Sequence, residues 1–105
     1  QSNDFNTGGN KSFNILEWNW AITNAVACLP ATCTLSVEIS TAPDVGGVPG
    51  TWTAWQGPYT STATGDVRQL LPTVLNGNRW VRYRANFAGN GTHTSILNWI
   101  RINYQ

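Results

Sequence analysis

Residues 13–23, FNILEWNWAIT, decide the fold class of this chain. Every second position from residue 16 carries a large apolar side chain: Leu16, Trp18, Trp20 and Ile22. The positions between them carry polar or small side chains: Glu17, Asn19 and Ala21. Alternation with a period of two is typical of a β-strand that buries one face and leaves the other open. The stretch therefore predicts a half-buried strand.

The next apolar run, TLSVEIS at residues 34–40, alternates in the same way. The segment ACLPATC between the two runs contains Cys28 and Cys33, and it reads as a turn. A short-loop disulfide in an oxidising compartment explains this pair better than free thiols do. Two thiols and the single histidine are too few for a zinc site. We therefore expect a hairpin of these two strands, pinned by a disulfide between Cys28 and Cys33.

Further strand and turn signals follow along the chain. Gly/Pro-rich and Asn-Gly segments mark the turns. Strand-like runs lie between them: TWTAWQGPY (51–59), VRQLL (67–71), RWVRYRANF (79–87) and SILNWIRINY (95–104). Several short strands at this spacing predict an all-β fold, a single antiparallel β-sandwich of jelly-roll-like type. We expect the sandwich to span residues 13–105, preceded by an N-terminal arm or loop over residues 1–12.

Composition restricts the class of protein. Of the 105 residues, 10% are charged, against about 25% in an average soluble protein, and 41% are hydrophobic. No apolar run approaches the roughly 20 residues of a membrane-spanning helix. The net charge of +1 argues against nucleic acid as a partner. With Gln1 taken as a mature terminus after signal-peptide cleavage, we expect a secreted protein.

The last two strand-like runs carry the most informative pattern. If residues 79–87 and 95–104 form a hairpin, with Val81 beside Ile102, their outward positions gather aromatic and basic side chains. That predicted contact face consists of Trp80, Arg82, Arg84, Trp99 and Arg101. The alternative is that another part of the same domain covers the face. Tryptophan and arginine are frequent at binding hot spots, so the pattern indicates a contact surface.

A second aromatic group consists of Trp52, Trp55 and Tyr59. Packing inside the domain is the simpler role for it, and a loop-end binding site is the alternative. No catalytic motif is present, and His93 stands alone in a glycine-rich turn, so we expect no enzyme. We expect no cofactor, with a structural calcium ion at Asp44 and Asp66 as the alternative.

Residues 76–104, NGNRWVRYRANFAGNGTHTSILNWIRINY, together with TWTAWQGPY at 51–59, resemble the end of a bacterial extracellular β-sandwich module. The resemblance spans roughly residues 33–104. It implies a jelly-roll-like accessory domain on secreted or surface proteins, a class often suspected of carbohydrate binding. Trp99 and Arg101 replace the small polar residues that the module has on its outer face. This departure favours self-association over glycan binding.

These patterns lead to two functional hypotheses. The first is a non-catalytic building block of an extracellular or cell-surface assembly, such as a pilus-like filament, a matrix fibre or an adhesin. Its partners are other copies of the chain or neighbouring surface proteins, and its location is outside the cell, on a bacterial surface. The second is a carbohydrate-binding module that stacks aromatic rings on sugars. Exposure of Trp80 and Trp99 beside a groove distinguishes the second from the first.

Overall fold

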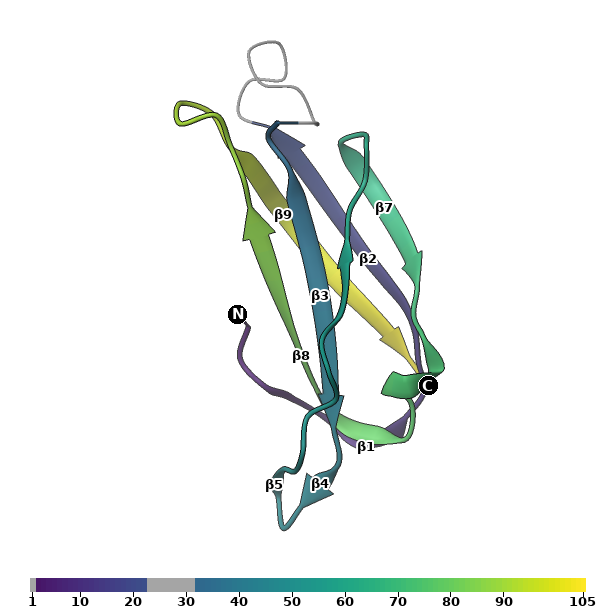
Figure 1. The fold of residues 1–105 in the computed structure, drawn as a ribbon. Helices are drawn as coiled ribbons and strands as arrows, with labels where there is room; N and C mark the ends of the chain where they lie inside the picture. Colours follow the sequence, from purple (N-terminus) through teal and green to yellow (C-terminus); the bar gives the residue numbers. More distant parts are fainter. Residues whose placement is uncertain (1, 23–31) are drawn as a thin grey trace.

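The computed structural model describes residues 2–22 and 32–105, and it confirms the predicted all-β antiparallel sandwich (Figure 1). Sheet A has the order β1 (Phe5–Lys11), β8 (Asn78–Phe87), β3 (Leu35–Ala42) and β6 (Gln56–Tyr59). Sheet B has the order β7 (Gly65–Leu70), β2 (Phe13–Ile22) and β9 (Ser95–Tyr104). A small hairpin of β4 (Asp44–Val45) and β5 (Val48–Pro49) and the 3-10 turn η1 (Thr73–Leu75) complete the described elements.

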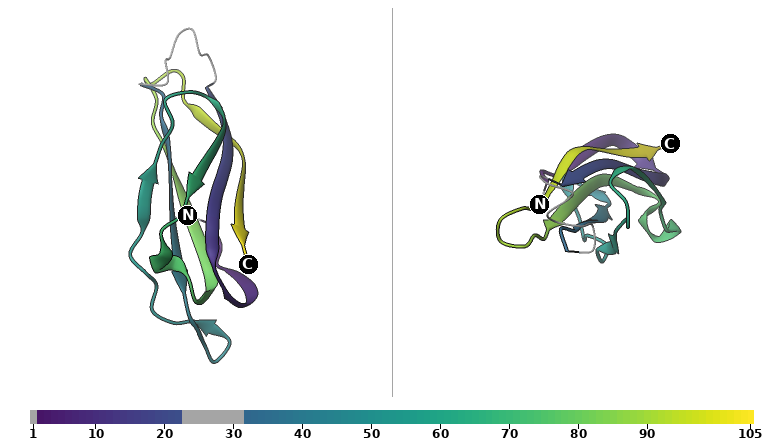
Figure 2. Two further views of the ribbon diagram at one scale, coloured as in Figure 1. Left: turned by 90° about the vertical axis from the view of Figure 1, so that its right-hand side faces the viewer. Right: turned by 90° about the horizontal axis from the view of Figure 1, so that it is seen from above.

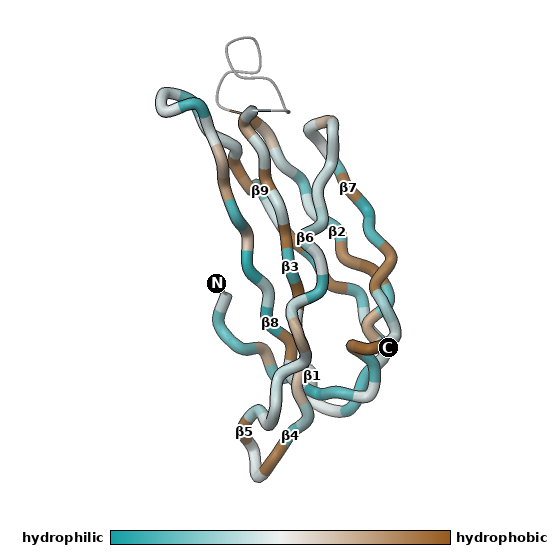
Figure 3. Tube along the Cα trace, viewed as in Figure 1, coloured by the Kyte–Doolittle hydropathy of each residue, from teal (hydrophilic) through white to brown (hydrophobic). Residues whose placement is uncertain are grey.

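The core lies between the two sheets, which face each other in the side view of Figure 2. The alternation of β2 buries Trp18 and Trp20 almost completely, and they pack with Leu35 and Val37 of β3. A second cluster joins Phe13, Ile39, Leu75 and Val81 nearer the other end of the sandwich. Apolar residues recur along β3 and β7 in Figure 3. The period-two pattern of the sequence therefore faces the core as expected.

The predicted strand pairings were wrong in two places. β2 and β3 lie in different sheets, so they do not form a hairpin. β8 and β9 lie in different sheets as well, because β8 pairs with β3 and β1 while β9 pairs with β2. In both cases the connecting segment is long enough to carry the chain from one layer to the other. A tight two-residue turn would have kept the strands adjacent.

The N-terminal segment differs from the predicted arm or loop over residues 1–12. Phe5–Lys11 forms β1, which pairs antiparallel with β8, and Phe5 stands opposite Val81. The Ser2 amide extends this contact by donating to the Tyr83 carbonyl oxygen at 2.8 Å. The glycines of the segment suggested a loop, and pairing with β8 overrides this local preference.

The molecule is elongated, with principal extents of 49 × 22 × 19 Å. The strands at the sheet edges are β1 and β6 in sheet A and β7 and β9 in sheet B. No helix within residues 2–22 and 32–105 is long and apolar enough to cross a membrane. Each sheet has one face on the core and one outer face, and the outer faces hold the side chains discussed next.

Candidate functional site

The outer face of sheet A carries an ion pair between neighbouring strands. Arg84 of β8 and Glu38 of β3 are register partners, and two parallel hydrogen bonds join them. Arg84 Nε donates to Glu38 Oε1 at 3.1 Å, and Nη2 donates to Oε2 at 2.9 Å. The Arg84 hydrogen bond is the main reason why the pKa of Glu38 lies below its ordinary value. Asn86 donates a further hydrogen bond to the same carboxylate.

Arg82 lies between two indole rings on this face. Its guanidinium carbon is 4.1 Å from the ring centre of Trp52 and 4.6 Å from that of Trp55. The Arg84 guanidinium also lies over Trp55, at 4.3 Å. Cation–π contacts of this kind stabilise by roughly 0.5–1 kcal/mol each at exposed sites. The segment 51–55 is therefore held against the outer face of sheet A, and the buried Arg82 Nε has no hydrogen-bond partner.

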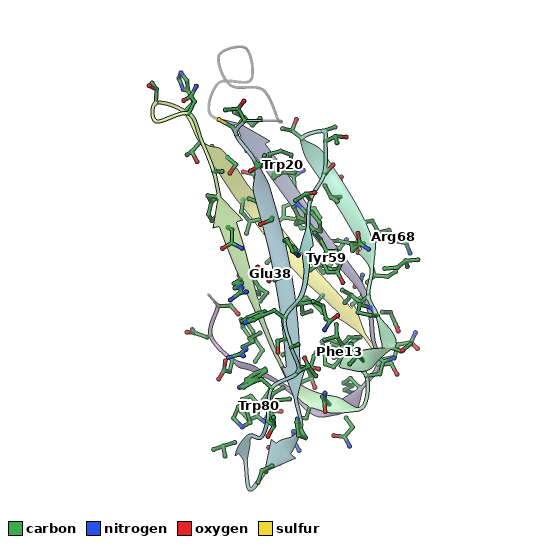
Figure 4. All side chains as sticks on the ribbon, in the orientation of Figure 1. Phe13, Trp20, Glu38, Tyr59, Arg68 and Trp80 are labelled. Carbon is green, nitrogen blue, oxygen red and sulfur yellow. The ribbon has the colours of Figure 1, made fainter. Side chains whose placement is uncertain are left out.

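Trp80 is held inside the chain as well. It is half-buried, and its Nε1 donates to Asp44 Oδ1 at 3.0 Å. Trp80 and Glu38 are labelled on sheet A in Figure 4. Trp52 and Trp55 lie over Arg82 and Arg84, so another segment of the same domain partly covers this half of the predicted face. The Arg84 side chain remains 38% exposed.

The outer face of sheet B carries a row of alternating charge. Glu17 of β2 stands in register between Arg68 of β7 and Arg101 of β9. Arg101 Nη2 lies 3.2 Å from Glu17 Oε2, and Asn103 Nδ2 donates to Glu17 Oε1 at 2.6 Å. The hydrogen bond from Arg101, followed by that from Asn103, holds the pKa of Glu17 below its ordinary value. The row fixes the positions of exposed side chains across the sheet.

Trp99 stands beside this row and remains 41% exposed. The Arg101 guanidinium lies over its ring at 5.3 Å. A chain of hydrogen bonds runs next to it: Asn98 donates to Asn19 Oδ1 at 2.7 Å, and Asn19 donates to Asp66 Oδ1 at 2.7 Å. Asn98 and Trp99 both lie near Asn19 because β9 has one extra residue at this point. Trp99 therefore presents an open indole beside polar side chains on this face.

The structure therefore divides the predicted contact face. Its residues from β8 lie on the outer face of sheet A, and its residues from β9 lie on the outer face of sheet B, on the opposite side of the sandwich. The prediction that these five residues form one face was therefore wrong. The physical reason is charge: each arginine strand lies next to a strand that supplies a glutamate, Glu38 or Glu17.

The second predicted aromatic group is divided as well. Trp52 and Trp55 lie on the outer face of sheet A, against Arg82. Tyr59 of β6 packs on the core with Leu71, and burial raises the pKa of its hydroxyl. The three rings do not form one binding site, and Trp52 and Trp55 have a packing role.

Two other predicted sites stay predictions. Cys28 lies outside the described residues; Cys33 is fully buried and is not a free thiol. Asp44 accepts a hydrogen bond from Trp80, and Asp66 accepts one from Asn19 on the outer face of sheet B. In the described part of the chain, no group of three or more His, Cys, Asp or Glu residues is placed to hold a metal ion.

Sequence reasoning missed one surface, the free edge of β9. Within residues 2–22 and 32–105, this strand pairs only with β2. Its sequence, SILNWIRINY, contains one charged residue, Arg101. The shortage of charge was visible in the sequence. The position of β9 at the edge of its sheet was not visible in the sequence, because the expected β8–β9 hairpin would have covered that edge.

Comparison with known proteins adds no assignment. No protein-family model, no curated protein and no solved structure matches this chain. The resemblance of residues 33–104 to a bacterial extracellular module stays a prediction. The function is therefore inferred from the outer faces of the two sheets.

Proposed function

We propose that this chain is a non-catalytic building block of an extracellular or cell-surface assembly, such as a pilus-like filament, a matrix fibre or an adhesin. It contacts its neighbours through the outer face of sheet B. The observation that carries this proposal is Trp99, which stays 41% exposed beside Arg101, whose side chain is 60% exposed. The low charge content of the chain supports a location outside the cell.

The chemistry of this face suits a protein–protein contact. Tryptophan and arginine dominate binding hot spots because each supplies a large contact area from few side chains. The hydrogen bonds of Glu17 to Arg101 and Asn103 restrict these side chains before a partner arrives. Restriction in advance lowers the entropy lost on association. The outer face of sheet A is less suited, because its arginines are already in contact with Trp52 and Trp55 of the same chain.

The test is light scattering with negative-stain imaging of the wild-type chain and of a Trp99→Ser/Arg101→Ser variant. We expect the wild type to form multimers that grow with concentration, and the variant to lose them while keeping its circular dichroism spectrum. Val48→Ser, at a more exposed apolar position on the β4–β5 hairpin, is the matched control and should assemble like the wild type. A wild-type chain that stays monomeric would refute the proposal.

Glycan binding is the second candidate, favoured by one observation. The chain of hydrogen bonds through Asn98, Asn19 and Asp66 places amide and carboxylate groups next to the open ring of Trp99. Sugar rings stack on indoles and bond to such groups. A glycan array separates the two candidates: binding by a monomeric chain, lost in Trp99→Ser, would favour this one.

A further inference from the structure

The four edge strands differ in how they are protected from pairing with another chain. β6 is four residues long and contains Pro58, and β7 carries Asp66 and Arg68. β1 loses its register with β8 part-way along. Short length, proline, charge and irregularity are the usual means by which edge strands avoid association. β9 has ten residues and one charge, Arg101, and its register with β2 is continuous from Trp99 to Asn103, so this stretch is the least protected edge in the described part of the chain.

A second observation places an open position beside this edge. Phe5 of β1 is the register partner of Val81, so it faces the inside of the sandwich, yet it is 49% exposed. Tyr104 of β9 also faces inward, where its ring meets Phe13, and it is 45% exposed. Sheet A has four strands and sheet B has three. One more strand beside β9 would match the number of strands in sheet A and cover the ring of Tyr104.

The backbone of β9 offers a regular edge to such a strand. Ser12 and Gln105 exchange both of their backbone hydrogen bonds, so the polar groups of Gln105 point toward β2. Register partners follow one another without interruption from Trp99 to Asn103. In an antiparallel pair, the N–H and C=O groups of one residue point to the same side of the strand, and those of the next residue point to the other side. Those of Ile100, Ile102 and Tyr104 therefore point to the free edge.

We propose that β9 pairs antiparallel with β9 of a second copy of this chain, about a two-fold axis at Ile102. In this register Ile102 meets its own counterpart, Ile100 meets Tyr104 of the second copy, and Arg101 meets Asn103 of the second copy. No like charges stand opposite each other. The Ile–Tyr pairs are of the aromatic and β-branched kind that stabilises cross-strand neighbours. The free N–H and C=O groups of both edges become paired.

The same register extends sheet B beyond β9. Ile102 packs with the cluster that contains Val81, and Ile102 of the second copy lies one strand outward from it. The pairing also joins the two outer faces of sheet B, so that Trp99 and Arg101 of both copies share one surface. This shared surface rests on the proposed function, because the β9-paired dimer would be the unit that assembles.

Register-specific crosslinking tests the pairing. Ile100 and Tyr104 of the second copy face each other in this register, so an Ile100→Cys chain mixed with a Tyr104→Cys chain should form a disulfide heterodimer while both chains keep Trp99 and Arg101. The matched control is a mixture of Asp66→Cys and Leu70→Cys chains, with the same spacing on β7. We expect at least a tenfold excess of heterodimer over this control on non-reducing gels. Equal yields from the two mixtures would overturn the pairing.

Amide hydrogen exchange of the wild-type chain provides a measurement that needs no variant. The amides of Ile100, Ile102 and Tyr104 should be protected at high protein concentration and lose that protection on dilution. Fast exchange of all three in a sample that light scattering identifies as multimeric would overturn the pairing and leave the proposed function intact. A chain that stays monomeric at every concentration would overturn both.

Discussion

Two glutamate carboxylates each accept hydrogen bonds from side chains of a neighbouring strand on the outer faces of this sandwich. Glu38 receives hydrogen bonds from Arg84 and Asn86 on sheet A, and Glu17 receives them from Arg101 and Asn103 on sheet B. The two glutamates are strand residues with lowered pKa values. They also explain why the arginines of β8 and β9 lie on opposite sides of the molecule.

Glu38→Gln should lower the free energy of unfolding at pH 7 by about 1 kcal/mol, because the bidentate ion pair becomes a weaker neutral contact. The folded-state pKa of Glu38 is depressed, so its contribution is complete above the unfolded pKa of about 4.3. It disappears as the pH falls through the folded-state pKa. Urea unfolding at pH 7 and pH 3 should therefore show a larger difference between variant and wild type at pH 7 than at pH 3.

The control for this prediction is Asp4→Asn, which removes an exposed carboxylate that makes no ion pair within residues 2–22 and 32–105. It should leave the stability at pH 7 within about 0.5 kcal/mol of the wild type. A Glu38→Gln variant as stable as Asp4→Asn at pH 7 would contradict the role given to the Glu38–Arg84 pair.

Trp55 contacts two guanidinium groups, those of Arg82 and Arg84, whereas Trp99 contacts one, that of Arg101. Trp55→Leu should therefore destabilise the chain by about 1–2 kcal/mol, and Trp99→Leu by less than about 1 kcal/mol. Chemical denaturation at a concentration low enough to keep the chain monomeric measures both. Equal losses would indicate that the rings contribute by buried area alone.

At the level of the elements, the strands were predictable and their partners were not. The period-two pattern of residues 13–23 and 34–40 identified β2 and β3, since a strand with one buried face needs that alternation. Partner choice depends on contacts between distant residues, and turn residues alone do not determine it. The segment 88–94 looked like a hairpin turn, yet it carries the chain from sheet A to sheet B.

The candidate site was predictable only in part, because alternation shows which face a residue is on but not which strand lies beside it. Trp99 and Arg101 were selected correctly as outward-facing residues of one strand, because alternation determines the face. Their association with Arg82 depended on the wrong hairpin. Glu17 and Glu38, at outward positions of β2 and β3, were the signal that could have corrected it: opposite charges favour neighbouring strands.

The connection between β8 and β9 depends on Gly89. A Cβ atom there would lie 2.2 Å from the His93 carbonyl oxygen, so the backbone of the turn would have to shift. Gly89→Ala should cost about 1–3 kcal/mol in the free energy of unfolding. Gly9→Ala is the control, because nothing lies within 4 Å of the added methyl group. Similar thermal midpoints for the two variants would contradict the close packing of this turn.

For the whole molecule, association and stability are linked. A second copy that binds only the folded chain raises the apparent stability as protein concentration rises. The thermal midpoint of the wild type should therefore increase with concentration, while that of the Trp99→Ser/Arg101→Ser variant should stay nearly constant. A wild-type midpoint that is independent of concentration over a hundredfold range would argue against association.

The elongated shape, the open outer face of sheet B and the unprotected edge of β9 all support one central claim, that this chain functions by associating with copies of itself. The most direct measurement is the mass of the wild-type chain in solution, by light scattering over a concentration series. We predict a mass near that of one chain, 11.5 kDa, at the lowest concentrations, which increases to twice that mass and beyond as the concentration rises. A mass of 11.5 kDa at every concentration would contradict it.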